Sequence, residues 1–403
     1  MRILISAGEA SGEMYGAQLM EALRKRLCKK PDSAGTGARA TLPLEFFGVG
    51  SEKMRAAGCE IVVDAKDLSV VGITEILSHL PRIWRLFRKL IVEADKRRPD
   101  LAIVIDSPAF NWRVARQMKK RGVPVVYYVC PQFWAWRQGR VRLLRKYVDK
   151  ALVIFPFEEK FYRDRGVNAE FVGHPLAELP RPDISRQEHA ARNGLDLSKP
   201  WITLMPGSRR KEVRMNLPAI LQAASLLGNK YEFLLPVAPT LDRNFVEALL
   251  TGTNNAGMET RIHLVPDALP ALAHSRVGII ASGTATVEAA MMETPFVMVY
   301  RVTPLTHLLG RWTVKVPYFA MVNLIAGEKV VPELVQQDFT AENVVAEISR
   351  IVCDGSPREK MQKGLHTVKE LLRGEIPGNA SERAADAIVP LLQTSSQSHG
   401  ASN

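Results

Sequence analysis

The chain has 403 residues, 46% of them hydrophobic and 24% charged, and its formal net charge at pH 7 is +12. This size and composition are typical of a globular protein with two or three domains. No stretch of about 18 uncharged apolar residues occurs, so we expect no membrane-spanning helix, and the first residues reach Glu9 too early for a signal peptide. The cysteines are scattered and the histidines lack metal-binding spacing, so we expect a cytoplasmic protein with reduced thiols, no metal site and no cofactor.

The excess of positive charge indicates an anionic partner. Basic residues are concentrated between positions 82 and 98 and again between 113 and 145. No zinc-finger, RNA-binding or basic-zipper pattern accompanies them. We therefore expect a phosphorylated substrate or an anionic membrane surface, and no nucleic acid.

Apolar runs and helical segments alternate along the whole chain, which predicts parallel sheets covered by helices. The expected strands are 3–6, 45–49, 61–63, 101–105, 125–129, 151–155 and 170–172, then 201–205, 231–236, 261–264, 277–281 and 296–300. A flexible insert is expected at 29–43, and a segment rich in proline, aspartate and arginine before Pro200 predicts a domain boundary.

The fold class that follows is α/β, with two Rossmann-like, doubly wound domains facing a cleft. We place them at 1–175 and 200–393, with a last helix able to pack back on the first domain and a disordered tail at 394–403. Ligands are expected in the cleft, where the carboxyl ends of the strands lie.

The stretch 277–300 carries the strongest functional signal. An apolar strand ends in Ser282, Gly283 and Thr284, and a helix with Glu288 one turn inside it follows. Small residues and a helix N-terminus at such a turn favour a phosphate or diphosphate, and the carboxylate of Glu288 could bind a ribose. The alternative is an ordinary strand-to-helix turn with a solvated glutamate.

A second turn of the same kind follows the expected strand 201–205. There Gly207, Ser208 and Arg209 precede a helix that begins near Glu212, and a guanidinium suits paired contacts to a diphosphate. The repetition favours a diphosphate site in the second domain, with Arg209 and Glu212 among its candidates.

Two loops of the first domain carry carboxylates at strand ends. Residues 7–13 are glycine-rich and acidic, with Glu9 and Ser11, but they depart from the dinucleotide-binding GxGxxG pattern. Asp106 directly follows the strand 101–105, where partial burial would raise its basicity toward that of a general base. The alternative role for Asp106 is to cap the helix that starts near Pro108.

The loop after the strand 125–129 is unusually aromatic. It contains Gln132, Trp134 and Trp136, which could line a pocket for a sugar or an acyl chain. Packing of these rings in a domain core is the alternative.

Residues 70–91 have apolar side chains at three- and four-residue steps and a basic face, and Pro81 is expected to separate two short helices. The residues expected to meet an anionic membrane are Arg82, Trp84, Arg85, Phe87, Arg88 and Lys89. Packing into a core is the alternative.

These segments together resemble the lipid-A-disaccharide synthase family, bacterial glycosyltransferases of the GT-B fold. The resemblance runs from about residue 2 to residue 390 and is carried by ISAGEASGE, VVGITEIL, IDSPAFN, VCPQFWAWR, FVGHPL, LMPGSRRKEV, ASGTATVEAAM, VYRVTPLT and NLIAGEKVVPELVQ. The chain departs from the family pattern at Ala109, where aspartate is usual, at Cys130, where serine is usual, and in the long insert 29–43.

The resemblance implies transfer of 2,3-diacylglucosamine from its UDP derivative to 2,3-diacylglucosamine 1-phosphate (lipid X), without a metal, at the inner face of the cytoplasmic membrane of a Gram-negative bacterium. A homodimer is compatible with it. Through NLIAG it also places Asn323 near the leaving group. Because the donor phosphates belong to the second domain, we expect the base of this inverting reaction in the first, with Asp106 preferred over Glu9.

Two other functions stay open from the residues alone. A non-hydrolysing UDP-sugar epimerase would share the fold and the ribose-binding glutamate, but it has no use for the amphipathic basic segment. A non-catalytic membrane-binding protein would leave the two phosphate-suited turns and Asp106 unexplained.

Overall fold

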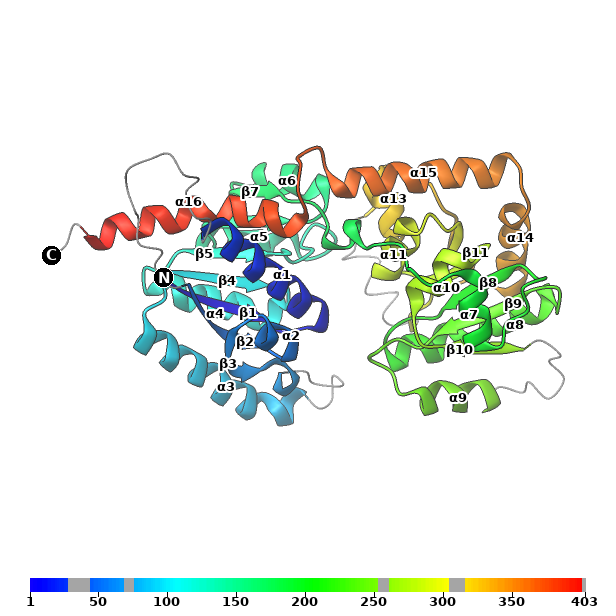
Figure 1. Ribbon diagram of the computed structural model, residues 1–403, viewed down its shortest axis with the longest axis horizontal. Helices are drawn as coiled ribbons and strands as arrows, with labels where there is room; N and C mark the ends of the chain where they lie inside the picture. Colours follow the sequence, from blue (N-terminus) through cyan, green and yellow to red (C-terminus); the bar gives the residue numbers. More distant parts are fainter. Residues whose placement is uncertain (28–43, 69–75, 253–260, 304–315, 401–403) are drawn as a thin grey trace. The chain divides into compact units, whose positions relative to one another are not determined.

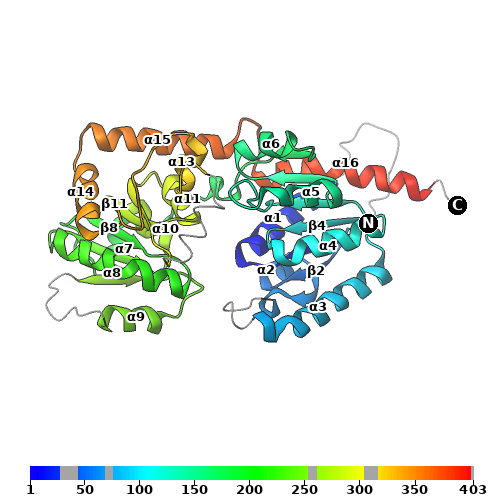
Figure 2. The ribbon, with the colours of Figure 1, turned by 180° about the vertical axis from the view of Figure 1, so that it is seen from behind.

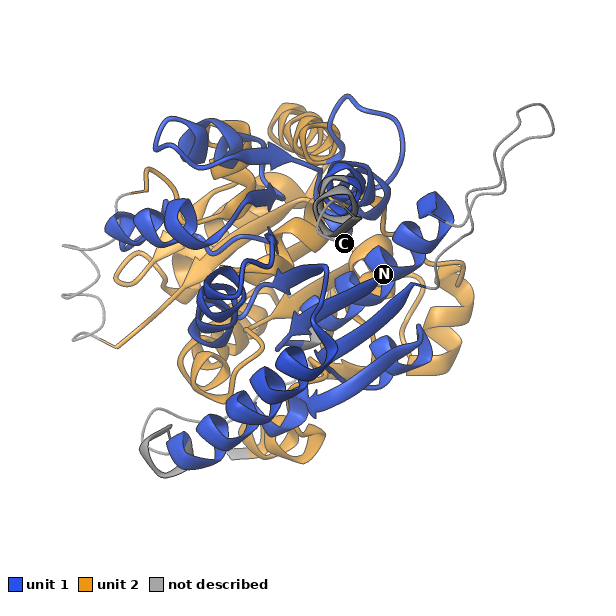
Figure 3. Ribbon diagram, turned by 90° about the vertical axis from the view of Figure 1, so that its left-hand side faces the viewer, with its two compact units in different colours: residues 1–175, 373–403 blue, residues 176–372 orange. Residues whose placement is uncertain are grey.

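The computed structural model describes residues 1–27, 44–68, 76–252, 261–303 and 316–400 (Figure 1). The chain forms two compact units, one of residues 1–175 and 373–403 and the other of residues 176–372 (Figure 3). The second unit thus starts earlier than the expected residue 200 and ends earlier than the expected residue 393. None of the helices in the described residues is both long and apolar enough to cross a bilayer.

The first unit contains a parallel sheet of seven strands in the order β3-β2-β1-β4-β5-β6-β7. Its strands are β1 (Arg2–Ala7), β2 (Glu45–Gly50), β3 (Cys59–Asp64), β4 (Leu101–Ile105), β5 (Val125–Tyr128), β6 (Lys150–Val153) and β7 (Ala169–Phe171). Its helices are α1 (Ala10–Leu27), α2 (Glu52–Ala56), α3 (Ile76–Arg97), α4 (Pro108–Lys120), α5 (Val141–Tyr147), α6 (Pro156–Arg163) and α16 (Ala380–Gly400). Three short 3-10 turns are η1 (Ala65–Asp67), η2 (Gln138–Arg140) and η3 (Pro175–Glu178). The chain passes into the second unit at η3.

Strand β4 shows why the centre of this sheet forms. All five of its side chains, from Leu101 to Ile105, are fully buried, as expected of a parallel strand covered by helices on both faces. Helices α1 and α16 pack against each other on one face, and α3, α4 and α5 follow one another on the other (Figure 2). The switch in strand order lies between β1 and β4, so their carboxyl ends form the expected ligand-binding edge.

The second unit contains a parallel sheet of six strands in the order β10-β9-β8-β11-β12-β13. Its strands are β8 (Trp201–Met205), β9 (Glu232–Pro236), β10 (Ile262–Val265), β11 (Val277–Ala281), β12 (Phe296–Tyr300) and β13 (Glu333–Val335). Its helices are α7 (Arg186–Asn193), α8 (Arg210–Leu227), α9 (Arg243–Gly252), α10 (Ala268–His274), α11 (Thr284–Met291), α13 (Met321–Ala326), α14 (Ala341–Val352) and α15 (Ser356–Arg373). Strands β8 and β11 pair at the switch in strand order of this sheet.

Three local features differ from what the sequence led us to expect. Helix α3 runs through Pro81 as one helix, so the expected separation into two short helices is not found. Helix α16 continues to Gly400, where a disordered tail was expected from residue 394. Strand β13 was not predicted at all. The insert 29–43 and residues 70–75 of the amphipathic segment lie outside the described residues.

Helix α16 belongs to the first unit because it is fastened there at two points. Asp386 accepts hydrogen bonds from Arg26 of α1 at 2.6 and 2.9 Å. The buried guanidinium of Arg383 donates to the carbonyl of Val172 at 2.7 Å, and it also binds the carbonyls of Ile376 and Gly378. These contacts tie the C-terminal segment back to the end of the first sheet.

Candidate active site

Asp106 occupies a strained turn at the carboxyl end of β4. The backbone is left-handed at Asp106 (φ 47°) and at Ser107 (φ 46°), a conformation that costs non-glycine residues free energy unless the surroundings fix it. The side chain of Ser107, which stands at the N-cap of α4, makes no capping hydrogen bond, and Asp106 precedes that position. The capping alternative for Asp106 therefore does not apply.

Asn111 fixes this turn from the first turns of α4. Its fully buried amide donates to the carbonyls of Ile105 (2.8 Å), Asp106 (2.9 Å) and Ser6 (3.1 Å), and its oxygen accepts from the Ser6 hydroxyl at 2.6 Å. The Tyr127 hydroxyl donates to the Asp106 carbonyl at 2.8 Å. One side chain thus joins the ends of β1 and β4, a role that the sequence analysis missed although it quoted IDSPAFN.

Asp106 has the electrostatic properties of a general base. Burial, together with the negative charge of nearby Glu9, raises the pKa of Asp106 to about 6. A base is most effective when its pKa lies near the working pH, because it is then ionised and still basic. The structure thus brings the two predicted catalytic carboxylates together.

The loop that carries Glu9 is short, because α1 begins within the glycine-rich stretch 7–13. Helix α1 starts at Ala10, so Glu9 directly precedes the helix and exposed Ser11 lies in its first turn. A Cβ atom on Gly8 would lie 2.5 Å from the Ser107 hydroxyl oxygen, so glycine is needed where this turn meets the Asp106 turn. The loop therefore packs against the turn that holds the candidate base.

The acceptor-binding role predicted for Trp134 does not fit the structure. Trp134 is 6% exposed, its indole N–H donates to Glu158 at 2.8 Å, and its ring packs edge-on against Phe157 with centroids 4.9 Å apart. The aromatic-core alternative holds for this ring, whereas Gln132 and Trp136 of the same loop are exposed. Burial raises the pKa of Glu158 to about 7.

In the second unit, the turn after β8 requires glycine at position 207. Gly207 has φ 129°, and a Cβ atom there would lie 2.7 Å from the Glu212 side chain, so only glycine fits. The Glu212 carboxylate accepts from the Ser208 N–H at 3.2 Å and from Arg209 at 2.7 Å. Arg209 remains largely exposed, with 76% of its side chain accessible.

The turn after β11 leaves open space beside Gly283. Gly283 (φ 140°) precedes α11, and a Cβ atom there would meet no atom within 4 Å. Thr284 is exposed, and the Ser282 hydroxyl donates to the carbonyl of Phe319 at 2.8 Å. Glu288, one turn further along α11, is partly buried, and burial raises its pKa.

Tyr300 lies close to both of these turns of the second unit. It ends β12, next to β11 in the sheet, and its ring centroid lies 6.3 Å from that of Phe319. The charges of Glu212 and Arg209 act on the Tyr300 hydroxyl, whose pKa is raised mainly by burial. The two predicted turns therefore lie at the same edge of this sheet, with an aromatic pair that the sequence analysis did not single out.

Asn323 cannot serve as the predicted nucleotide ligand, because its amide is already fully hydrogen-bonded. Its nitrogen donates to the Val331 carbonyl (3.0 Å) and to Glu333 (2.8 Å), and its oxygen accepts from the N–H groups of Val330 (2.8 Å) and Val331 (2.9 Å). An amide offers two donors and two acceptor sites, so no capacity is left. Asn323 instead holds the segment that leads into β13.

Comparison with known proteins shows the family of the chain. The family model described as lipid-A-disaccharide synthetase matches residues 3–388. The lipid-A-disaccharide synthase of Koribacter versatilis (strain Ellin345) is 53% identical over 394 residues, which cover 98% of this chain and 99% of that protein.

Solved structures with low sequence identity share the fold. A UDP-GlcNAc 2-epimerase from Neisseria meningitidis, bound to UDP-GlcNAc, has a TM-score of 0.57 at 13% identity and covers 98% of this chain and 100% of its own. The calicheamicin glycosyltransferase CalG4 has a TM-score of 0.56 at 16% identity, covering 97% and 98%. Fold similarity alone would leave transferase and epimerase undecided, but the family match and the 53% identity decide between them. The chain belongs to the lipid-A-disaccharide synthase family of glycosyltransferases.

Proposed function

We propose that the protein transfers a 2,3-diacylglucosaminyl group from UDP to the 6-hydroxyl of 2,3-diacylglucosamine 1-phosphate. The products are a β-1,6-linked disaccharide 1-phosphate and UDP. The observation that carries the proposal is the partly buried Asp106, whose pKa is raised, beside Glu9 in the first unit, in a chain whose second unit carries two phosphate-suited turns.

In this proposal Asp106 accepts the proton of the acceptor hydroxyl as its oxygen attacks the sugar carbon. The bond from that carbon to the UDP oxygen breaks, and the configuration inverts. Arg209 and the turn at Ser282–Thr284 would hold the diphosphate, whose developing negative charge the start of α11 favours. Glu288 would bind the ribose hydroxyls.

A transfer assay tests this function against its closest alternative. The enzyme is incubated with the UDP-sugar donor in the presence and absence of the phosphorylated acceptor, and the products are separated. We expect disaccharide and UDP only when both are present. Conversion of a UDP-sugar without an acceptor would instead indicate an epimerase, the activity of one fold neighbour.

We further propose that α3 attaches the enzyme to an anionic membrane. Leu80 and Trp84 are 48% and 57% exposed, and the guanidinium of Arg88 lies 4.6 Å from the Trp84 ring centroid. Arg85, Arg88 and Lys89 make no ion pair with any residue in the described parts of the chain. Exposed aromatic and unpaired basic side chains on one helix suit an anionic interface.

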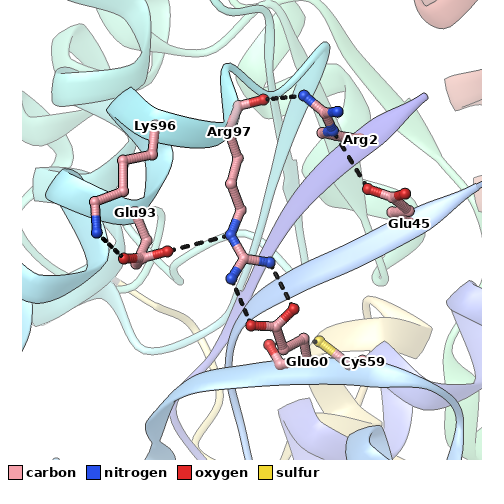
Figure 4. A network of polar contacts seen from close by, with 7 residues as sticks. All are labelled: Arg2, Glu45, Cys59, Glu60, Glu93, Lys96 and Arg97. Atoms are coloured by element: carbon pink, nitrogen blue, oxygen red, sulfur yellow. Dashed lines mark hydrogen bonds and ion pairs between the residues drawn. The ribbon is translucent and has the colours of Figure 1, made fainter.

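Other residues of α3 are engaged with the protein. Phe87 packs on the core and meets Phe110 edge-on with centroids 5.8 Å apart, and Arg82 pairs with Asp67. Neither therefore fits the membrane contact predicted from the sequence. At the other end, Arg97 binds Glu60 and Glu93 and fastens the helix to the sheet (Figure 4).

Vesicle sedimentation tests the membrane proposal. Changing Arg85, Arg88 and Lys89 to Ser should weaken binding to anionic vesicles about 100-fold, because each basic residue contributes about 1 kcal/mol. A control with Lys25, Lys53 and Lys66 changed to Ser removes the same charge from other exposed positions. If both variants bind as the parent does, α3 is not the contact surface.

A further inference from the structure

An arginine-lined surface pocket lies beside the aromatic loop of the first unit. It is lined by Gln138, Gly139, Val141, Arg142, Arg145 and Arg165. The turn η2 and helix α5 supply all but the last, which comes from the turn after α6. Arg142 and Arg145 are three residues apart on α5, so they project from the same side of that helix.

Two of these arginines are held in place by their surroundings. The Arg165 guanidinium lies 3.8 Å from the centroid of the Phe161 ring and donates to the Phe161 carbonyl at 3.0 Å and to Gln138 at 3.4 Å. Arg145 passes close to the backbone of Gly166, where φ is 75° and an added Cβ would lie 3.2 Å from the Arg145 Cδ. The Arg165 guanidinium is therefore oriented before any ligand arrives.

The positive charge of the pocket is not neutralised by the protein. No carboxylate in the described residues lies within ion-pair distance of Arg142, Arg145 or Arg165, and none lines the pocket. Some basic residues close by in the sequence are paired, namely Lys150 with Glu170 (2.5 Å), Lys160 with Asp164 (3.0 Å) and Arg163 with Glu159 (2.7 Å). Three like charges gathered without a counter-charge favour an anionic ligand.

The guanidinium groups of the pocket favour phosphate as the anion. Guanidinium groups bind phosphate oxygens through paired, charge-assisted hydrogen bonds. Gln138 also donates to the Trp134 carbonyl at 3.1 Å, which joins the pocket to the loop with exposed Gln132 and Trp136. The pocket and this loop therefore adjoin each other.

We propose that Arg142, Arg145 and Arg165 bind the phosphate group of a lipid. One source is the 1-phosphate of the acceptor, in which case the inference rests on the proposed function. The other is the headgroup phosphate of an anionic phospholipid. Both present the same group to the same guanidinium forks.

Steady-state kinetics of the full-length enzyme in neutral detergent micelles test the acceptor as the source. The variants Arg145→Gln and Arg165→Gln should each raise the KM for the phosphorylated acceptor about ten-fold, since a charged hydrogen bond is lost. The kcat and the KM for the UDP-sugar donor should stay unchanged. Arg145→Lys, which keeps the charge but loses the fork, should fall between parent and Gln variant.

Binding to phosphatidylglycerol vesicles without substrates tests the headgroup as the source. The single variants Arg142→Gln, Arg145→Gln and Arg165→Gln should each bind less tightly in this arm than a variant that loses one charge elsewhere only if the headgroup is bound at the pocket. The matched control is Arg163→Gln, an exposed arginine at the end of α6 that is paired with Glu159.

A larger effect than that of Arg163→Gln, on either the KM for the acceptor or the binding to phosphatidylglycerol vesicles, supports the lipid-phosphate site. The experiment in which the effect is seen identifies the source of the phosphate. If the variants match Arg163→Gln in both arms while the parent makes disaccharide, the inference is overturned and the proposed function stands. Loss of the parent's transfer activity would instead count against the proposed function, and the vesicle arm would still test the pocket.

Discussion

The pH dependence of transfer tests the tuning of Asp106 by Glu9. Asp106 has a pKa of about 6, and only its carboxylate form can accept a proton. At pH 7 about nine-tenths of the enzyme then carries the active form, and at pH 5 about one-tenth. The rate at saturating substrates should therefore fall about ten-fold for each pH unit below 6.

Changing Glu9 to Gln should move this acid limb to lower pH. The substitution removes a negative charge that disfavours ionisation of Asp106, while the burial that is the larger cause of the raised pKa stays. The pKa should thus fall toward the ordinary value of 3.8 without reaching it. Near pH 5, the Glu9→Gln variant should therefore keep a larger fraction of its maximal rate than the parent keeps of its own maximal rate.

The assay is UDP release between about pH 5 and 8 for the parent, Glu9→Gln and Asp106→Asn. Since the acceptor phosphate itself titrates near pH 6, the comparison between variants carries the test rather than the parent profile alone. Asp106→Asn should lose about 100- to 10,000-fold in kcat and should still bind UDP. An unchanged acid limb in Glu9→Gln would refute the coupling. If Asp106→Asn keeps a near-parental kcat while the kcat of Glu9→Gln collapses, Glu9 and not Asp106 is the general base.

Two further predictions concern the second unit. Glu288→Ala should weaken UDP binding about ten- to a hundred-fold, because a charged hydrogen-bond partner of the ribose is lost; unchanged affinity by calorimetry would remove Glu288 from the site. Asn323→Ala should lower the free energy of unfolding by about 2–4 kcal/mol, because it leaves the buried N–H groups of Val330 and Val331 without their acceptor. Urea unfolding measures this loss, and a variant as stable as the parent would show that Asn323 is not the anchor that its contacts indicate.

The sheets could be predicted from the sequence because their strands are short apolar runs buried on both faces. The expected strands 101–105, 201–205, 277–281 and 296–300 coincide with β4, β8, β11 and β12. Strand β13 escaped prediction because it has three residues and begins with Glu333, whose carboxylate accepts from the N–H groups of Phe319 and Ala320. A glutamate at an edge strand gives no local signal of that role.

The candidate site residues that could be placed from the sequence are those that directly follow a strand, because the end of the strand fixes where they lie in the fold. Asp106 and the Ser282–Thr284 turn directly follow parallel strands, so they had to lie at carboxyl ends. Asn323 and Trp134 were misassigned because their partners come from other segments: the N–H groups near β13 and the carboxylate of Glu158. Hydrogen bonds between distant segments cannot be seen in a residue pattern.

Glu158 gives rise to a prediction about stability that the sequence alone could not provide. Its fully buried carboxylate accepts from the N–H groups of Trp134 (2.8 Å), Phe155 (3.1 Å) and Ile154 (3.2 Å), and it forms no ion pair in the described parts of the chain. Burial outweighs these hydrogen bonds, which favour the charged form, and raises the pKa of Glu158 to about 7 in the folded protein against an ordinary 4.5.

The sign of the pH effect follows from proton binding. Between about pH 4.5 and 7 the folded state holds a proton that the unfolded state has lost, so stability is greatest below this range and falls as the pH rises through 7. The difference of about 2.5 pKa units corresponds to about 3 kcal/mol. Glu158→Gln, which cannot ionise, should lower stability overall but lose this pH dependence. Urea unfolding at about pH 5 and pH 8 measures it, with the exposed, ion-paired Glu159→Gln as control. An unchanged pH slope in Glu158→Gln would mean that groups other than Glu158 cause the pH dependence of the parent, and that the carboxylate which accepts from Trp134 does not hold a proton in this range.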